Sequence, residues 1–173
     1  AIYITVGTGV GVGVYANGAL LHGLIHPEAG HMLIARQEGD DYPGKCPYHR
    51  NCLEGLAAGP AIMERFGRPA AELADRGEVW ELVSDYLAQA VANYILILSP
   101  QKVILGGGVM HQEQMFPLVR KKVQEKLNSY LHSDTILEHI KDYIVPPALG
   151  DNAGITGALL LGFGELENLA AQQ

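Results

Sequence analysis

Hydrophobic and polar residues alternate through the first residues of the chain, which is the pattern of β-strands. Ile2, Ile4 and Val6 alternate with Tyr3 and Thr5, and this period of two places one set of side chains on one face of a strand. Glycines interrupt the pattern at 7–9, and an Asn-Gly pair at 17–18 is typical of a tight hairpin turn. The sequence therefore predicts a three-stranded meander over residues 2–21.

Apolar residues recur at helical spacing through much of the remaining chain. The longest such pattern covers 78–98 and ends at Ser99-Pro100, and a second one covers 112–130. Shorter patterns predict helices over 53–58, 61–66, 70–74 and 153–161, and strands over 32–35, 102–105 and 143–145. Together they indicate an α/β domain whose mixed central sheet carries the two long helices.

Composition narrows the class of protein. At 173 residues, 48% of them hydrophobic and 18% charged, the chain fits one globular core. A net charge of −7 without a basic run argues against nucleic-acid binding. The sequence shows neither an apolar run of membrane-spanning length nor a signal peptide, so we expect a cytoplasmic protein. Because the chain opens at Ala1 directly in a strand pattern, we expect a fragment whose N-terminal part is missing.

A candidate metal site is centred on the two cysteines. Cys46, His49 and Cys52 follow one another at three-residue spacing on a turn-rich segment, and His31 lies upstream. Sulfur and imidazole nitrogen are the preferred ligands of tetrahedral zinc. We therefore predict a structural zinc site on these four residues. The alternatives are a disulfide between the cysteines, or two free thiols beside an incidental histidine.

Two glycine-rich turns are candidates for binding phosphate. Gly7-Thr8-Gly9 joins two predicted strands, where glycine lets another group approach the backbone closely. The alternative for this turn is a bulged, tightly packed sheet. Gly106-Gly107-Gly108 lies between a predicted strand and a predicted helix. In that arrangement, backbone N–H groups and a helix N-terminus can hold a nucleotide.

Four separated motifs resemble the C-terminal lobe of the ROK family of sugar kinases, within the actin/hexokinase-like ATPase superfamily. The motifs are ITVGTGVGVG, HPEAGH with CPYHRNCLEG, VILGGGV and GDNAGITGA, and they extend over nearly the whole chain. The resemblance implies an actin-like, ribonuclease H-like lobe with a zinc-binding loop. One departure is His49, where many family members carry a cysteine. Imidazole also serves as a zinc ligand, so the predicted site is retained.

The resemblance also implies roles for individual residues. They are Gly7, Thr8 and Gly9 near the phosphates of ATP; Gly106, Gly107, Gly108 and Val109 against adenosine, with Pro100 in the wall; and Glu28, His31 and Glu54 on the sugar hydroxyls. His31 would bind sugar through one ring nitrogen and zinc through the other, which fixes its tautomer. For the two glutamates the alternative is a solvated surface carboxylate. Mg²⁺ would bridge the phosphates.

The family's catalytic aspartate and first phosphate loop lie in its N-terminal lobe, and neither is recognisable here. We therefore expect residues 1–173 to form the C-terminal lobe of a kinase, paired in a homodimer and inactive without the other lobe. HPEAGH and CPYHRNCLEG resemble the fructokinase branch, which implies phosphorylation of fructose to fructose 6-phosphate. Alternatives are a glucokinase or mannokinase of the same family, or a sugar-responsive ROK transcriptional repressor. A small zinc-stabilised binding module would not explain the two glycine turns.

Overall fold

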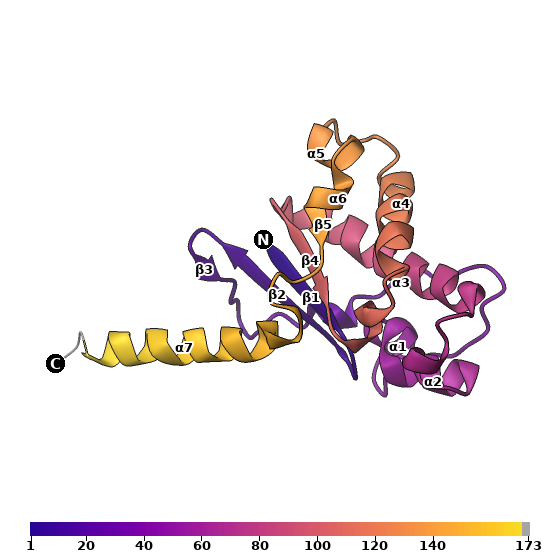
Figure 1. Cartoon of the computed structure of the whole chain (residues 1–173), viewed down its shortest axis with the longest axis horizontal. Coiled ribbons are helices and arrows are strands. Elements are labelled where there is room, and N and C mark those ends of the chain that lie inside the picture. The colour runs from indigo at the N-terminus through magenta and orange to yellow at the C-terminus, as the bar shows by residue number, and fades with distance from the viewer. Residues whose placement is uncertain (171–173) are drawn as a thin grey trace.

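Five strands form one mixed sheet in the order β3-β2-β1-β4-β5 in the computed structural model, which describes residues 1–170 (Figure 1). They are β1 (Ile2–Val6), β2 (Val10–Ala16), β3 (Ala19–Leu20), β4 (Val103–Gly106) and β5 (Ile144–Val145). The first three strands pair antiparallel, which confirms the predicted meander. β4 pairs parallel with both β1 and β5. Because β1 and β4 are parallel, the two glycine turns leave the sheet at the same end.

Helices cover one face of this sheet (Figure 1). The helices of the chain are α1 (Leu53–Ala57), α2 (Gly59–Phe66), α3 (Gly77–Leu98), α4 (Met115–Leu127), α5 (Asp134–Leu137), α6 (Ile140–Tyr143) and α7 (Ala153–Ala170), with short 3₁₀ turns η1 (Ala29–His31), η2 (Ala70–Glu72), η3 (Gly108–His111) and η4 (Gly150–Asn152). Of these, α3 and α4 pack on the buried face, and α7 does not. The alternating set Ile2, Ile4 and Val6 is fully buried in one hydrophobic cluster with residues of α3 and α4. The set facing the other way, Tyr3 and Thr5, is half-buried.

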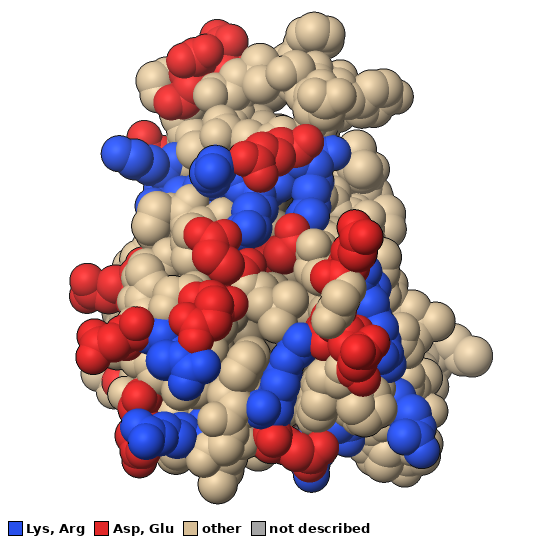
Figure 2. Space-filling model, turned by 90° about the vertical axis from the view of Figure 1, so that its right-hand side faces the viewer, with Lys and Arg blue, Asp and Glu red and all other residues tan. Residues whose placement is uncertain are grey.

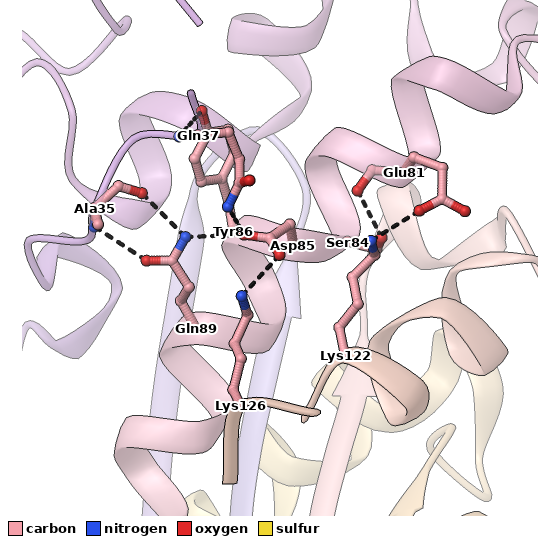
Figure 3. A network of polar contacts seen from close by, with 9 residues as sticks. All are labelled: Ala35, Gln37, Glu81, Ser84, Asp85, Tyr86, Gln89, Lys122 and Lys126. Atoms are coloured by element: carbon pink, nitrogen blue, oxygen red, sulfur yellow. Dashed lines mark hydrogen bonds and ion pairs between the residues drawn. The ribbon is translucent and has the colours of Figure 1, made fainter. Parts of the chain in front are cut away.

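The long helix α3 carries a polar side as well as its buried one (Figure 3). Lys126 and Lys122 of α4 form ion pairs with Asp85 and Glu81 of α3, each at 2.7 Å. These contacts tie α4 to α3 at the edge of the core. The predicted helices over 78–98 and 112–130 therefore exist, although residues before Met115 form η3 and a turn instead of a first helical turn.

The predicted strand over 32–35 is wrong. Leu33 makes a single bridge with Cys52, and no ladder follows it. Instead, the backbone N–H of Ala35 donates to Gln89 Oε1, and Gln89 Nε2 donates to the carbonyl of Ala35, both at 3.0 Å (Figure 3). A side-chain amide offers the same donor and acceptor as a neighbouring strand, so this segment pairs its polar groups without joining the sheet.

Three other regions differ from the prediction. The helix predicted over 70–74 is a 3₁₀ turn, η2, that ends at Glu72. The short helices α5 and α6 were not predicted, and α7 continues to Ala170 instead of ending at Leu161. Figure 1 shows α7 extending away from the rest of the molecule. Its apolar side chains, Ile155, Leu159, Leu160, Leu161, Phe163 and Leu166, are exposed.

Charged side chains of both signs lie on the surface. On the face in Figure 2, basic and acidic side chains are interspersed over the surface. Among the described residues, no helix combines the length and the apolar character that a membrane crossing requires.

Candidate functional site

The four predicted metal ligands converge on one point. One ligand atom from each of His31, Cys46, His49 and Cys52 lies within 4.8 Å of the other three. His31 Nδ1 is 3.6 Å from the sulfur of Cys46 and 3.6 Å from that of Cys52, and His49 Nδ1 is 3.7 Å from Cys46 Sγ. Ligand atoms on a tetrahedral zinc ion are separated by roughly 3.6 Å when Zn–S and Zn–N bonds have their usual lengths. The spacing therefore fits zinc.

The segment 43–52, called the metal loop below, is shaped by tight backbone contacts. Gly44 has a left-handed φ of 95°, and side chains on Gly44 or Gly55 would overlap the carbonyl of Arg50. Cys52 caps α1, since its sulfur accepts from the N–H of Gly55 at 3.4 Å. The N–H of His49 reaches the sulfur of Cys46 at 3.5 Å. Donors of this kind orient thiolate ligands in metal sites.

The two cysteines are buried free thiols, so the structure gives no support to the disulfide alternative. Burial raises the pKa of the Cys52 thiol to about 11. Burial acts in the same direction on Cys46, but hydrogen bonds from the backbone of His49 and Tyr48 outweigh it and lower the pKa of that thiol to about 6. A divalent cation would favour the thiolate form of both sulfurs, because metal binding releases their protons.

The metal loop is tied to α2 and α3 through a second, polar cluster. The Asp40 carboxylate is 3% exposed and forms an ion pair with Arg65 of α2, besides accepting from the hydroxyl of Tyr86 of α3. Arg65 also lies over the ring of Tyr42, 5.3 Å from its centre. Lys45 pairs with Glu64 of α2. The chain on both sides of Pro43 is thus held independently of any metal.

Two of the three predicted sugar contacts, His31 and Glu54, lie together at the metal-ligand cluster. His31 directs Nδ1 at the two sulfurs and places Nε2 3.8 Å from Glu54 Oε1. The tautomer required by the sequence hypothesis is therefore compatible with the geometry. Glu54 is partly buried near the start of α1, and Glu28 is exposed at the start of η1. Tyr94 of α3 holds η1 in place, since its hydroxyl donates to the carbonyl of Ala29 at 2.7 Å.

The first glycine turn, residues 7–9, lies against the N-terminus of α2. The N–H of Gly59 donates to the carbonyl of Gly7 at 2.8 Å, and the N–H of Gly7 donates to Gly9 at 2.9 Å. Thr8 is exposed at the tip of the turn. The turn borders a largely apolar cavity of about 470 Å³ whose lining residues are Gly7, Thr8, Gly59, Pro60, Met63, Pro69, Ala70, Gly108 and Val109. Four of the predicted nucleotide contacts therefore face one cavity.

The residues of the second glycine turn, 106–108, border two different cavities. Gly107 has a left-handed φ of 92°, and a Cβ there would lie 2.7 Å from the backbone nitrogen of Val6. Gly106 and Gly107 border a separate cavity of about 440 Å³ on the open face of the sheet. Gly108 has open space beside it. Gly107 thus lets the end of β4 lie close to Val6 of β1. Gly108 is the residue of this turn that faces the cavity at Thr8.

Pro100 lies apart from the other predicted nucleotide contacts. It precedes β4, whereas the glycines lie at the end of that strand and after it. Pro100 borders cavities with Ser99, Gln101 and Tyr143. The structure instead brings Gly59, Pro60 and Met63 of α2 and Pro69 to the cavity at Thr8. These residues were not expected there. The only local signal was the Gly-Pro pair at 59–60, which marks a helix start in a sequence and gives no indication of what lies beside it.

Known proteins resemble this chain over nearly its full length. The sequence model of the ROK family matches residues 1–164. A curated relative from Bacillus subtilis (strain 168) is 55% identical over 170 residues, which cover 98% of this chain and 57% of the relative. A fructokinase from Pediococcus pentosaceus is 46% identical over 168 residues, which cover 97% of this chain and 57% of that protein. This chain therefore spans less than two thirds of the length of either relative.

The fold is also found among solved structures. The crystal structure of a ROK hexokinase from Thermus thermophilus matches with a TM-score of 0.74 at 26% identity, over 96% of this chain and 58% of that chain. The predicted α/β lobe of the actin-like class, with a mixed sheet and flanking helices, is thereby confirmed. From its motifs, its fold and its relatives, we conclude that the chain belongs to the ROK family.

Proposed function

We propose that the full-length protein carrying this chain transfers a phosphoryl group from Mg-ATP to a hexose. The proposal rests on one observation: the first glycine turn lies beside the carboxylate of Glu54 at one end of the sheet. The N–H of Val10, directly after the turn, donates to Glu54 Oε2 at 3.0 Å. A site that positions a sugar hydroxyl against a terminal phosphate needs both groups in one place, because phosphoryl transfer depends chiefly on positioning and charge stabilisation.

The proposed substrate is fructose, which would become fructose 6-phosphate. The fructokinase of Pediococcus pentosaceus, 46% identical to this chain, supports that choice. Glu28, His31 and Glu54 would bind the sugar hydroxyls, since carboxylates accept hydrogen bonds and an imidazole held in one tautomer offers a defined donor. Glucose or mannose as the preferred substrate is the alternative within the same family.

We place ATP against the cavity at Thr8. Its walls combine the half-buried backbone of Gly7 and the exposed backbone of Gly108 with the apolar side chains of Pro60, Met63 and Val109. An apolar pocket with a few backbone donors suits a purine and its ribose. The phosphates would then lie along the first glycine turn, and Mg²⁺ bound with ATP would supply charge neutralisation there.

Zinc would have a structural role on His31, Cys46, His49 and Cys52. Four protein ligands close its coordination shell and leave no position for water or substrate. Its effect on catalysis would come from holding His31 beside Glu54, while charge stabilisation at the phosphate belongs to Mg²⁺.

The general base would be supplied by residues outside this chain. None of the aspartates here lies in a motif that resembles the family's catalytic one, and this chain covers 57% of each of the two relatives described above. We propose that the remaining part forms a second lobe, and the exposed apolar side chains of α7 support a covering partner. Homodimerisation and a cytoplasmic location are further parts of the proposal. The repressor alternative is not favoured, because relatives at 38–46% identity are named fructokinases.

The test is a coupled assay of the purified full-length protein with Mg-ATP and fructose, mannose or glucose in parallel. We expect kcat/KM to be highest for fructose, with fructose 6-phosphate as the product. Higher kcat/KM for glucose would make the protein a glucokinase of the same family. No turnover with any of the three sugars would overturn the proposal.

A further inference from the structure

The Glu54 carboxylate contacts two different parts of the proposed site. Oε2 accepts the N–H of Val10 at 3.0 Å, and Val10 is the first residue of β2, directly after the first glycine turn. Oε1 lies 3.8 Å from His31 Nε2. That separation is too long for a hydrogen bond, so Oε1 keeps the capacity to accept one from another donor. The Glu54 side chain thus lies between the first glycine turn and His31 of the proposed sugar site.

Gly9 supplies the space that this carboxylate occupies. A Cβ on residue 9 would lie 2.6 Å from Glu54 Oε2 and 3.5 Å from Glu54 Cδ, with no other atom among its near neighbours. Gly9 is not among the glycines with positive φ, so its backbone conformation is open to any residue. An added Cβ at this position would therefore displace the flexible end of the Glu54 side chain and would meet no backbone atom of the turn.

We infer that Glu54, in the space provided by Gly9, couples sugar binding to phosphate binding. This inference rests on the proposed function. A sugar hydroxyl that donates to Oε1 fixes the carboxylate, and the fixed Oε2 in turn holds the N–H of Val10 and the end of the turn. Phosphates that order the turn hold the carboxylate ready for sugar in the same way. Such coupling is reciprocal, so each substrate raises the affinity for the other by the same factor.

Closure of two lobes around both substrates would also couple their binding, and it would not depend on Gly9. The variant Gly9→Ala separates the two explanations. It leaves the chemistry of Glu54 intact but forces its carboxylate out of its place. Gly13→Ala is the matched control, since Gly13 lies in the same hairpin, has no neighbour within 4 Å of its Cβ position and lacks a positive φ.

The experiment measures the dissociation constant of a non-hydrolysable ATP analogue with and without saturating fructose, in the zinc-loaded full-length protein. For wild type and Gly13→Ala we expect fructose to tighten analogue binding by about fivefold or more. For Gly9→Ala we expect a factor near one with an unchanged zinc content. Coupling that survives Gly9→Ala, or that is lost equally in Gly13→Ala, overturns the inference. Absence of fructose binding in wild type would instead show that the proposed function is wrong.

A second measurement needs no variant. Hydrogen exchange at the amide of Val10 reports the bond to Glu54 directly, because a bonded amide exchanges only when the bond opens. We expect fructose alone, without nucleotide, to slow this exchange relative to the amide of Gly13. An unchanged exchange rate at Val10 in the presence of bound fructose contradicts the inference.

Discussion

The carbonyl oxygen of Val10 occupies the space in which a side chain on Gly30 would begin. Gly30 lies between Ala29 and His31 in η1, and it is buried against the start of β2. The N–H of Val10 therefore donates to Glu54, and its carbonyl lies against Gly30 of η1. The strand that follows the first glycine turn and the segment that carries His31 are in direct backbone contact.

Replacement of Gly30 by alanine should separate these two backbones. The new methyl group meets main-chain atoms, which cannot rotate away as a side chain can, so η1 must shift. We expect a loss of about 1–3 kcal/mol in unfolding free energy and a raised KM for sugar. Gly23→Ala in the same loop is the control, because its nearest neighbour is 3.9 Å away. Denaturant unfolding and sugar kinetics check this, and equal behaviour of both variants would contradict it.

The Asp40–Arg65 pair should make stability depend on acid pH. Burial acts to raise the pKa of the Asp40 carboxyl, but hydrogen bonds from Tyr86 and Arg65 outweigh it and hold the pKa below its usual value. A group with a depressed folded pKa stabilises the fold above its unfolded pKa of about 3.9. That contribution is lost as the pH falls through the folded pKa.

Asp40→Asn should consequently reduce stability at neutral pH by about 3 kcal/mol, because it leaves Arg65 buried without its partner charge. It should also flatten the decline of unfolding free energy below about pH 4. Glu78→Gln is the control, since the pair of Glu78 with Arg76 is exposed on both sides. Urea unfolding across a pH series measures both effects. An unchanged acid decline in Asp40→Asn would exclude Asp40 as its source.

Gly108→Val should raise the KM for ATP by about tenfold and leave the KM for sugar nearly unchanged. Gly108 has open space at its Cβ position and faces the cavity at Thr8, so the added methyl groups would occupy volume proposed for the nucleotide. Gly107 is unsuitable for this test, because its left-handed φ and its contact with Val6 would perturb the sheet. Steady-state kinetics measure the KM for ATP and the KM for sugar in Gly108→Val, with Gly13→Val as the control. A larger change in the sugar KM than in the ATP KM would count against the location of the nucleotide.

Much of the fold follows from local patterns in the sequence. The period of two in the first strand, the Asn-Gly turn and the long helical repeat of α3 each depend on near neighbours, and each is found in the structure. The segment 32–35 was mistaken for a strand because its apolar run does not reveal that Gln89, far away in sequence, pairs with Ala35. The length of α7 was underestimated for a related reason, because its exposed apolar residues break the amphipathic pattern.

In the candidate site, too, features that depend on residue type could be predicted, and features that depend on contacts between distant residues could not. The grouping of His31, Cys46, His49 and Cys52 could be predicted, because thiol and imidazole groups at close spacing carry their chemistry in the residue type. The wall of the cavity at Thr8 could not, since Gly59 and Pro60 reach it through the packing of α2 on the first glycine turn. Gly9 was assigned to phosphate contact, and its fit against Glu54 became visible only when residues 9 and 54 were placed together.

The central claim is that zinc holds the metal loop so that Glu28, His31 and Glu54 converge on the sugar. The direct test measures bound zinc and sugar affinity side by side in full-length wild type and Cys52→Ala, with ATP-analogue affinity as the internal reference. We predict that Cys52→Ala loses zinc, with a local destabilisation on the order of several kcal/mol, and that it binds sugar more weakly while its affinity for the analogue changes less. A variant that has lost its zinc and still binds sugar with wild-type affinity would contradict the account.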